Sequence, residues 1–103
     1  MSESKDSTSR SNRPHISYID PTTVKQNDEV SLTVIGENFI STSLVFVDAH
    51  VPVTKVVSDT RLEAKLTREE TGSLGSKAVL VHDAETGDIS NSVTLTVERA
   101  SDS

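Results

Sequence analysis

The stretch LTVIGENF, residues 32–39, decides the fold of this chain. Leu32 and Val34 alternate with polar residues, as in a strand with one face in the core and the other in water. Gly36 permits a backbone conformation that residues with a side chain disfavour. Phe39 is one of only two phenylalanines, so its ring is expected to fill much of a small core. The stretch therefore predicts a half-buried strand that runs into a glycine turn.

Six further segments have the composition of short strands and are separated by turn residues. The alternation is clearest where Leu62, Ala64 and Leu66 are expected to face inward. Residues 67–71 have room for one turn of helix only. Together with residues 30–35, the expected strands cover residues 15–19, 43–47, 53–57, 61–66, 77–82 and 92–97. This spacing is typical of an all-β sandwich of about seven strands.

The size and composition indicate one small domain. A chain of 103 residues has room for a single modest core. Aromatic residues make up only 3% of it, so the core is expected to consist of valine, leucine and isoleucine, which favour strands. We expect the domain at residues 14–98, between a flexible polar tail at 1–13 and a second tail at 99–103. The absence of cysteine excludes disulfides and thiolate metal sites.

The formal charge of −6 bears on the expected partners. An acidic surface disfavours phosphate backbones, so no nucleic-acid partner is expected. No apolar run approaches the roughly 18 residues that span a membrane, so no membrane association is expected either. The polar N-terminus is not that of a secretory signal. A full-length chain is therefore expected in the cytoplasm or in a particle assembled inside the cell, and a fragment of a longer surface protein would be extracellular.

Four short motifs, in the same order as here, are similar to those of the IPT/TIG family of immunoglobulin-like domains. The resemblance extends over residues 14–98. Leu95 stands where the family commonly has an aromatic residue. The motifs are PHI at 14–16 with Pro21, LTVIGENF with Gly36, Asn38 and Phe39, VSDT at 57–60 with Leu62, and a closing hairpin with Gly87 and Asn91.

The resemblance implies an immunoglobulin-like β-sandwich of the early-set type. It also implies a spacer, dimerisation unit or binding module and no catalyst. The residues agree with this expectation, because no glycine-flanked nucleophile is present. We therefore expect no enzyme activity and no cofactor. A small-molecule ligand is also not expected, since a small sandwich offers no obvious deep pocket.

Two places deserve scrutiny as metal sites. Asp48 and His50 could share one side of an extended segment, but two ligands do not make a zinc site. The pair Glu69 and Glu70 is interpreted as a solvated charge pair. No metal site is therefore predicted at either place.

Asp83, Glu85 and Asp88 place three carboxylates in one turn, which is a hint of calcium. An ordinary hairpin turn is the preferred interpretation, because a calcium loop usually needs more oxygen ligands at fixed spacing. The alternative function is a ligand-binding accessory module of a larger protein. It would bind calcium at this turn or a carbohydrate at Tyr18.

Two expected strands are apolar on both faces. In residues 43–47, Leu44 and Phe46 match inward positions of the family, which leaves Val45 and Val47 pointing outward. In residues 77–82, inward Val79 and Val81 leave three residues outward. The predicted partner interface is thus Val45, Val47, Ala78, Leu80 and His82. A contiguous apolar patch is typical of an interface, so the leading hypothesis is a non-catalytic module that binds a protein partner or itself. It would be a small subunit of a larger assembly or a structural spacer domain.

Overall fold

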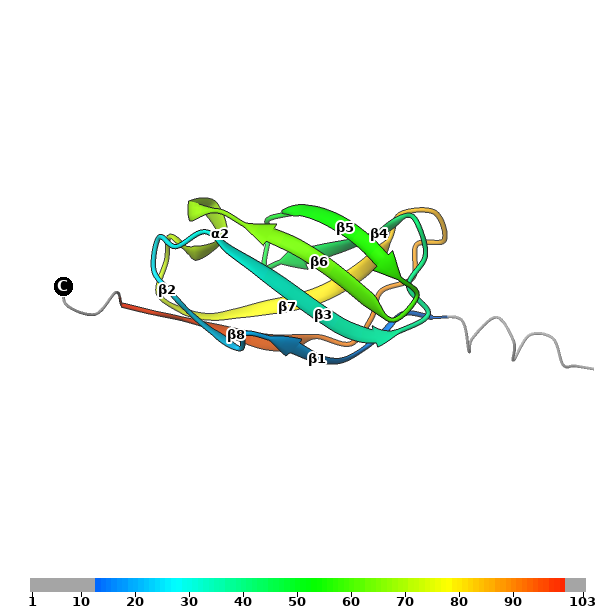
Figure 1. Cartoon of the computed structure of the whole chain (residues 1–103), viewed down its shortest axis with the longest axis horizontal. Helices are drawn as coiled ribbons and strands as arrows, with labels where there is room; N and C mark the ends of the chain where they lie inside the picture. Colours follow the sequence, from blue (N-terminus) through cyan, green and yellow to red (C-terminus); the bar gives the residue numbers. More distant parts are fainter. Residues whose placement is uncertain (1–12, 100–103) are drawn as a thin grey trace, which may run out of the picture.

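The computed structural model describes residues 13–99, which form two four-stranded sheets packed face to face (Figure 1). One sheet has the strand order β1-β3-β6-β5 and the other has the order β2-β8-β7-β4. The elements are β1 (His15–Asp20), β2 (Thr23–Lys25), β3 (Val30–Glu37), β4 (Ser43–Val47), β5 (Val53–Ser58), β6 (Arg61–Leu66), α2 (Arg68–Thr71), β7 (Gly75–Asp83) and β8 (Val93–Glu98). The all-β immunoglobulin-like sandwich predicted from the sequence is confirmed.

The short strand β2 is an addition to the seven predicted strands. It pairs in parallel with β8, from Thr23 opposite Thr96 to Lys25 opposite Glu98. Lys25 Nζ lies 3.0 Å from Glu98 Oε1 across this pair. Three residues are too few to show a period of two, so the sequence pattern does not reveal this strand. Through β1 and β2, the N-terminal part of the domain contributes a strand to each sheet.

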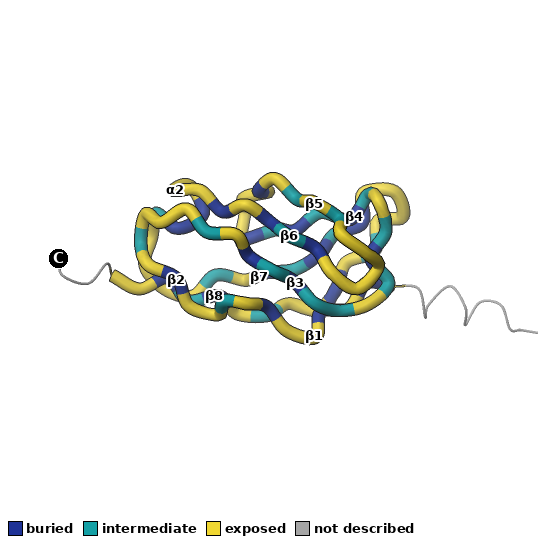
Figure 2. The backbone as a smooth tube through the Cα atoms, in the orientation of Figure 1, coloured by how far each residue is buried: buried dark blue, intermediate teal, exposed yellow. Residues whose placement is uncertain are grey.

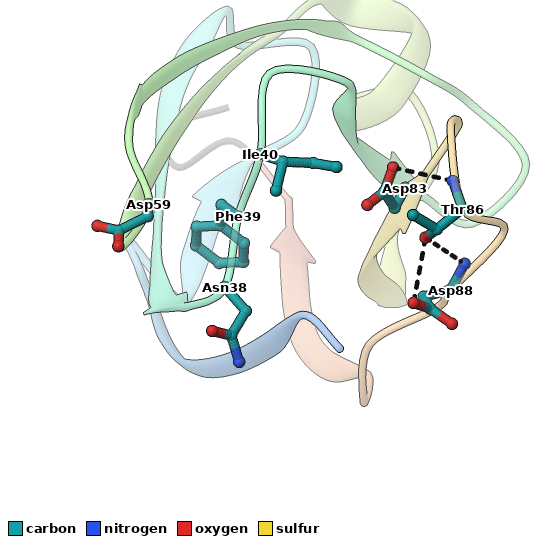
Figure 3. Close-up of a pocket in the computed structure, with 7 residues that line it drawn as sticks. All are labelled: Asn38, Phe39, Ile40, Asp59, Asp83, Thr86 and Asp88. Carbon is teal, nitrogen blue, oxygen red and sulfur yellow. Dashed lines mark hydrogen bonds between the residues drawn. The ribbon is translucent and has the colours of Figure 1, made fainter. Parts of the chain in front are cut away.

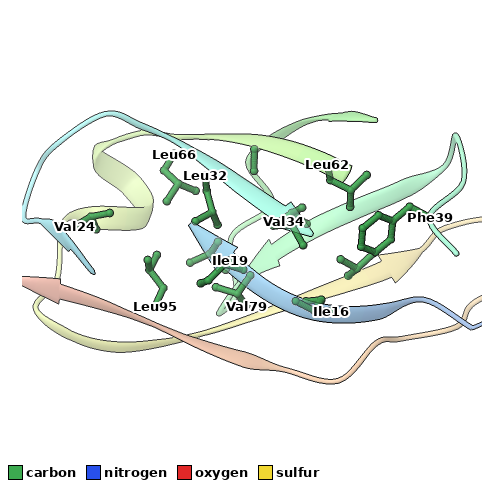
Figure 4. Packing of buried hydrophobic residues seen from close by; sticks show 14 of the residues in the cluster. Ile16, Ile19, Val24, Leu32, Val34, Phe39, Leu62, Leu66, Val79 and Leu95 are labelled. Atoms are coloured by element: carbon green, nitrogen blue, oxygen red, sulfur yellow. The ribbon is translucent and has the colours of Figure 1, made fainter. Parts of the chain in front are cut away.

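The core lies between the two sheets and consists almost entirely of aliphatic side chains (Figure 4). Buried and exposed positions alternate along the strands, as Figure 2 shows. In β6, Leu62, Ala64 and Leu66 all point inward, as predicted. Phe39 is 2% exposed and is the only aromatic side chain in the core cluster of the described residues.

Gly36 is required for a reason that differs from the predicted one. Its φ does not lie in the left-handed region, and in this turn Asn38 adopts positive φ, at 65°. A Cβ at position 36 would collide with the carbonyl oxygen of His15 and would lie 2.9 Å from Phe39 Cζ. Close packing of β1 and the Phe39 ring therefore excludes a side chain here.

The other residues of the predicted signature hold turns and strand ends. Gly87 has φ of 82°, a conformation that favours glycine. Asn38 Nδ2 donates to the carbonyl oxygen of Arg13 at 3.1 Å, and Asn91 bonds to β1. Pro21 lies between β1 and β2, after a cis peptide bond. Apart from Arg13 and Arg99, both predicted tails lie outside the described residues.

Candidate functional site

The outer face of β4 and β7 is apolar, but two of the five residues predicted to lie on it do not. Val45 and Val47 are both 0% exposed and belong to the core. They pair with Val81 and Val79 of β7, which were correctly predicted to face inward. Residues opposite one another in an antiparallel pair lie on the same face of the sheet, so this register turns both β4 valines inward.

Leu44 and Phe46 consequently point outward, contrary to the prediction. Leu44 lies opposite His82, and Phe46 lies opposite Leu80. The Phe46 and His82 rings meet edge to face, with centroids 5.6 Å apart and an interplanar angle of 79°. We call this surface the β4–β7 face; it consists of Leu44, Phe46, Ala78, Leu80 and His82.

The β4–β7 face is only partly covered. Ala78 is exposed, while the other four residues of the face are half-buried. Asp48 holds the end of the face: its Oδ1 accepts from Ala78 N at 2.8 Å, and its own amide donates to Ala78 O at 2.8 Å. The face is thus an apolar surface across two strands that pair along their length.

A second group of exposed apolar residues lies on β5. Val53 is 76% exposed and Val57 is 47% exposed. Charged residues interrupt this group, because Lys55 lies between the two valines and Lys65 lies opposite Val53. The β4–β7 face contains no aspartate, glutamate, lysine or arginine, so it is the more continuous apolar surface.

The acidic turn after β7 lines an open depression of about 540 Å³ at the end of the sandwich (Figure 3). Asp83 is 4% exposed, and its Oδ1 accepts from Thr42 Oγ1 at 2.9 Å and from Glu85 N at 3.0 Å. Asp88 accepts from Thr86 Oγ1 at 3.1 Å. The carboxylates of Asp83 and Asp88 thus organise the turn, as the hairpin interpretation predicts. The lining residues are Asn38, Phe39, Ile40, Asp59, Asp83, Thr86 and Asp88.

The hydrogen bonds to Asp83 outweigh the effect of its burial on the pKa. Burial raises the pKa of this carboxyl group, because it disfavours the charged form. The Thr42 hydroxyl and the amides of Glu85 and Thr86 stabilise the carboxylate and bring the pKa below its ordinary value of 3.8. Asp83 therefore acts as an ionised structural acceptor.

Glu69 and Glu70 were both predicted to be solvated, and for Glu70 this prediction is wrong. Glu69 is exposed, but Glu70 is only 5% exposed. Glu70 Oε1 accepts from Thr67 N at 2.7 Å and from Thr67 Oγ1 at 2.9 Å, which completes a capping box at the start of α2. The signal for this burial is in the sequence, since Thr-x-x-Glu is the usual pattern of a capping box.

Asp48 and His50 do not form a ligand pair. Asp48 is engaged by Ala78, whereas His50 is exposed in the connection between β4 and β5. Tyr18, the predicted sugar contact of the alternative function, is 56% exposed on β1. A single exposed ring offers a limited stacking surface for a carbohydrate.

The two sheets, the aliphatic core and the surface described above define an immunoglobulin-like β-sandwich module. The family model described as "IPT/TIG domain" matches residues 14–97. The chain belongs to the IPT/TIG family, as its motifs predicted. A comparison with curated proteins finds no match. No helix within residues 13–99 is long and apolar enough to cross a membrane.

Proposed function

We propose that this protein is a non-catalytic module that acts by binding another protein through the β4–β7 face. The observation that carries the proposal is the continuity of apolar side chains across two paired strands, with Leu44 opposite His82 and Phe46 opposite Leu80. Contiguous apolar surfaces of this kind mark interfaces. Aromatic anchors such as Phe46 are enriched at the centres of such contacts.

The charge of the chain supports a protein as the partner. A formal charge of −6 disfavours a nucleic-acid backbone. The module would serve as a small subunit of a larger assembly or as a spacer that docks on its neighbour. In this proposal the same surface serves for self-association or for binding to a different protein. The experiment below distinguishes these two cases.

The test compares three forms of the protein: the wild type, the double variant Phe46→Glu with Leu80→Glu, and the control Val53→Glu. The control introduces one carboxylate, where the double variant introduces two, at an exposed valine of the other sheet. Light scattering after size exclusion, over a range of concentrations, measures self-association. If the wild type is monomeric, affinity capture from the source cells compares the proteins bound by the three forms.

We expect the double variant to stay folded by circular dichroism and to lose association at least tenfold, while Val53→Glu behaves as the wild type. Equal association of all three forms would contradict the proposal. Equal loss in the control and in the double variant would also contradict it.

A further inference from the structure

Three potential metal ligands from two separate segments meet beside α2. His50 comes from the connection between β4 and β5, and Glu69 and Glu70 belong to α2. One ligand atom of each side chain lies within 4.8 Å of the others. An imidazole nitrogen and two carboxylate oxygens thus converge from residues that no sequence motif connects.

The segment that carries His50 is held in place. His50 N donates to Val47 O at 2.9 Å, and Val47 N donates to His50 O at 2.9 Å, which closes a tight turn. Asp48 inside this turn is bound to Ala78, and His50 is the residue of the turn whose side chain approaches α2. The imidazole therefore starts from a fixed backbone position.

Glu70 carries a buried carboxylate that forms no ion pair with another of the described residues. It is 5% exposed, and Thr67 supplies both hydrogen bonds to its Oε1. Within residues 13–99, the second oxygen of Glu70 receives no hydrogen bond, and no lysine, arginine or histidine nitrogen lies within 4.0 Å of either oxygen. Buried carboxylates normally have a compensating positive charge, and a bound metal ion would supply it.

We propose that His50, Glu69 and Glu70 bind one divalent transition-metal ion of the zinc class. Zinc accepts imidazole nitrogen and carboxylate oxygen at about 2.0–2.2 Å, whereas calcium prefers oxygen ligands alone. Tetrahedral ligand atoms at those bond lengths lie about 3.4 Å apart. The ligand atoms lie within 4.8 Å of one another in the structure. The exposed side chains of His50 and Glu69 reach the shorter separation by moving about 1 Å inward, and a water molecule takes the fourth position.

Thr67 is the positioning residue of this site. Its amide and hydroxyl hold Glu70 Oε1, which is the arrangement by which outer hydrogen bonds orient a metal-bound carboxylate. The ion would tie the β4–β5 connection to the turn of helix that follows β6. Because β4 and β6 belong to different sheets, the ion would cross-link the two layers at one end of the sandwich.

The experiment is isothermal titration of the full chain with zinc chloride at one fixed pH, with calcium chloride as a second titrant. We expect one zinc ion per chain and no comparable binding of calcium. His50→Gln and Glu69→Gln should each weaken zinc binding at least tenfold. Both side chains are exposed, so neither substitution threatens the fold.

Two matched controls, His15→Gln and Glu37→Gln, remove an exposed histidine and an exposed glutamate elsewhere. They should bind zinc as the wild type does. Amide shifts in a nitrogen-15 spectrum should be confined to residues around His50 and α2, and zinc should raise the melting temperature of the wild type and the controls only. Unchanged zinc binding in His50→Gln and Glu69→Gln, loss in the controls, or equal affinity for calcium would each overturn the proposal.

Discussion

The side chain of Asn91 forms hydrogen bonds with both backbone polar groups of Ile16. Its side-chain oxygen accepts from Ile16 N at 2.8 Å, and its side-chain nitrogen donates to Ile16 O at 3.0 Å. Ile16 belongs to β1 in one sheet, whereas Asn91 precedes β8 in the other. One amide side chain therefore satisfies both backbone groups of a buried residue and joins the two layers.

Replacing Asn91 with alanine should lower the free energy of unfolding by about 1–3 kcal/mol. The substitution leaves the peptide groups of Ile16 without partners, and unsatisfied buried groups carry a cost of that size. Urea denaturation monitored by circular dichroism measures the change. Ser92→Ala, at an exposed neighbouring position, is the control and should change stability by less than about 0.5 kcal/mol. An equally small effect of Asn91→Ala would mean that water replaces both bonds.

Gly36→Ala should destabilise the fold by about 1–3 kcal/mol, in the range of overpacked cores. The added methyl group would meet the His15 carbonyl and the Phe39 ring, so β1 must move away from β3. Combining it with Phe39→Leu relieves only the contact with the ring. The double variant should therefore recover little stability, and full recovery would show that the ring rather than β1 excludes the side chain.

Val45 and Leu44 should respond in opposite ways to a charge. Val45→Glu buries a carboxylate in the core at a cost of several kcal/mol, enough to unfold a small domain. Leu44→Glu places the charge on the half-buried outer face and should leave the protein folded. Circular dichroism and thermal melting of the two variants decide the point. A folded Val45→Glu protein would mean that the facing of β4 is the reverse.

The facing of β4 shows where the sequence pattern is insufficient. In β6 only one face is apolar, so the alternation alone orients Leu62 and Leu66 correctly. In β4 every residue after Ser43 is apolar, and a period of two then selects neither face. Pairing with β7 decides the orientation, because Val45 lies opposite Val81.

The candidate metal site illustrates a second limit. The capping box that buries Glu70 could be recognised from Thr67 and Glu70 alone. The approach of His50 could not, because it depends on how the β4–β5 connection packs against α2. Local motifs therefore predicted the turns and the family, while contacts between distant segments required the structure.

The stability of the protein should depend on pH through Asp83. Its pKa is lower in the folded protein than in the unfolded chain, so the unfolded chain binds the proton more readily. The stabilisation is complete above the ordinary pKa of 3.8, which the unfolded chain has, and is lost as the pH falls through the lower pKa of the folded protein. Denaturation midpoints measured from pH 6 down to pH 2 should decrease more steeply for the wild type than for Asp83→Asn, which keeps an acceptor oxygen but no titrating charge. Thr42→Val removes one donor to Asp83 Oδ1 and should give an intermediate slope. Identical slopes for all three proteins would contradict this prediction. They would show that the pKa of Asp83 is the same in the folded protein and in the unfolded chain.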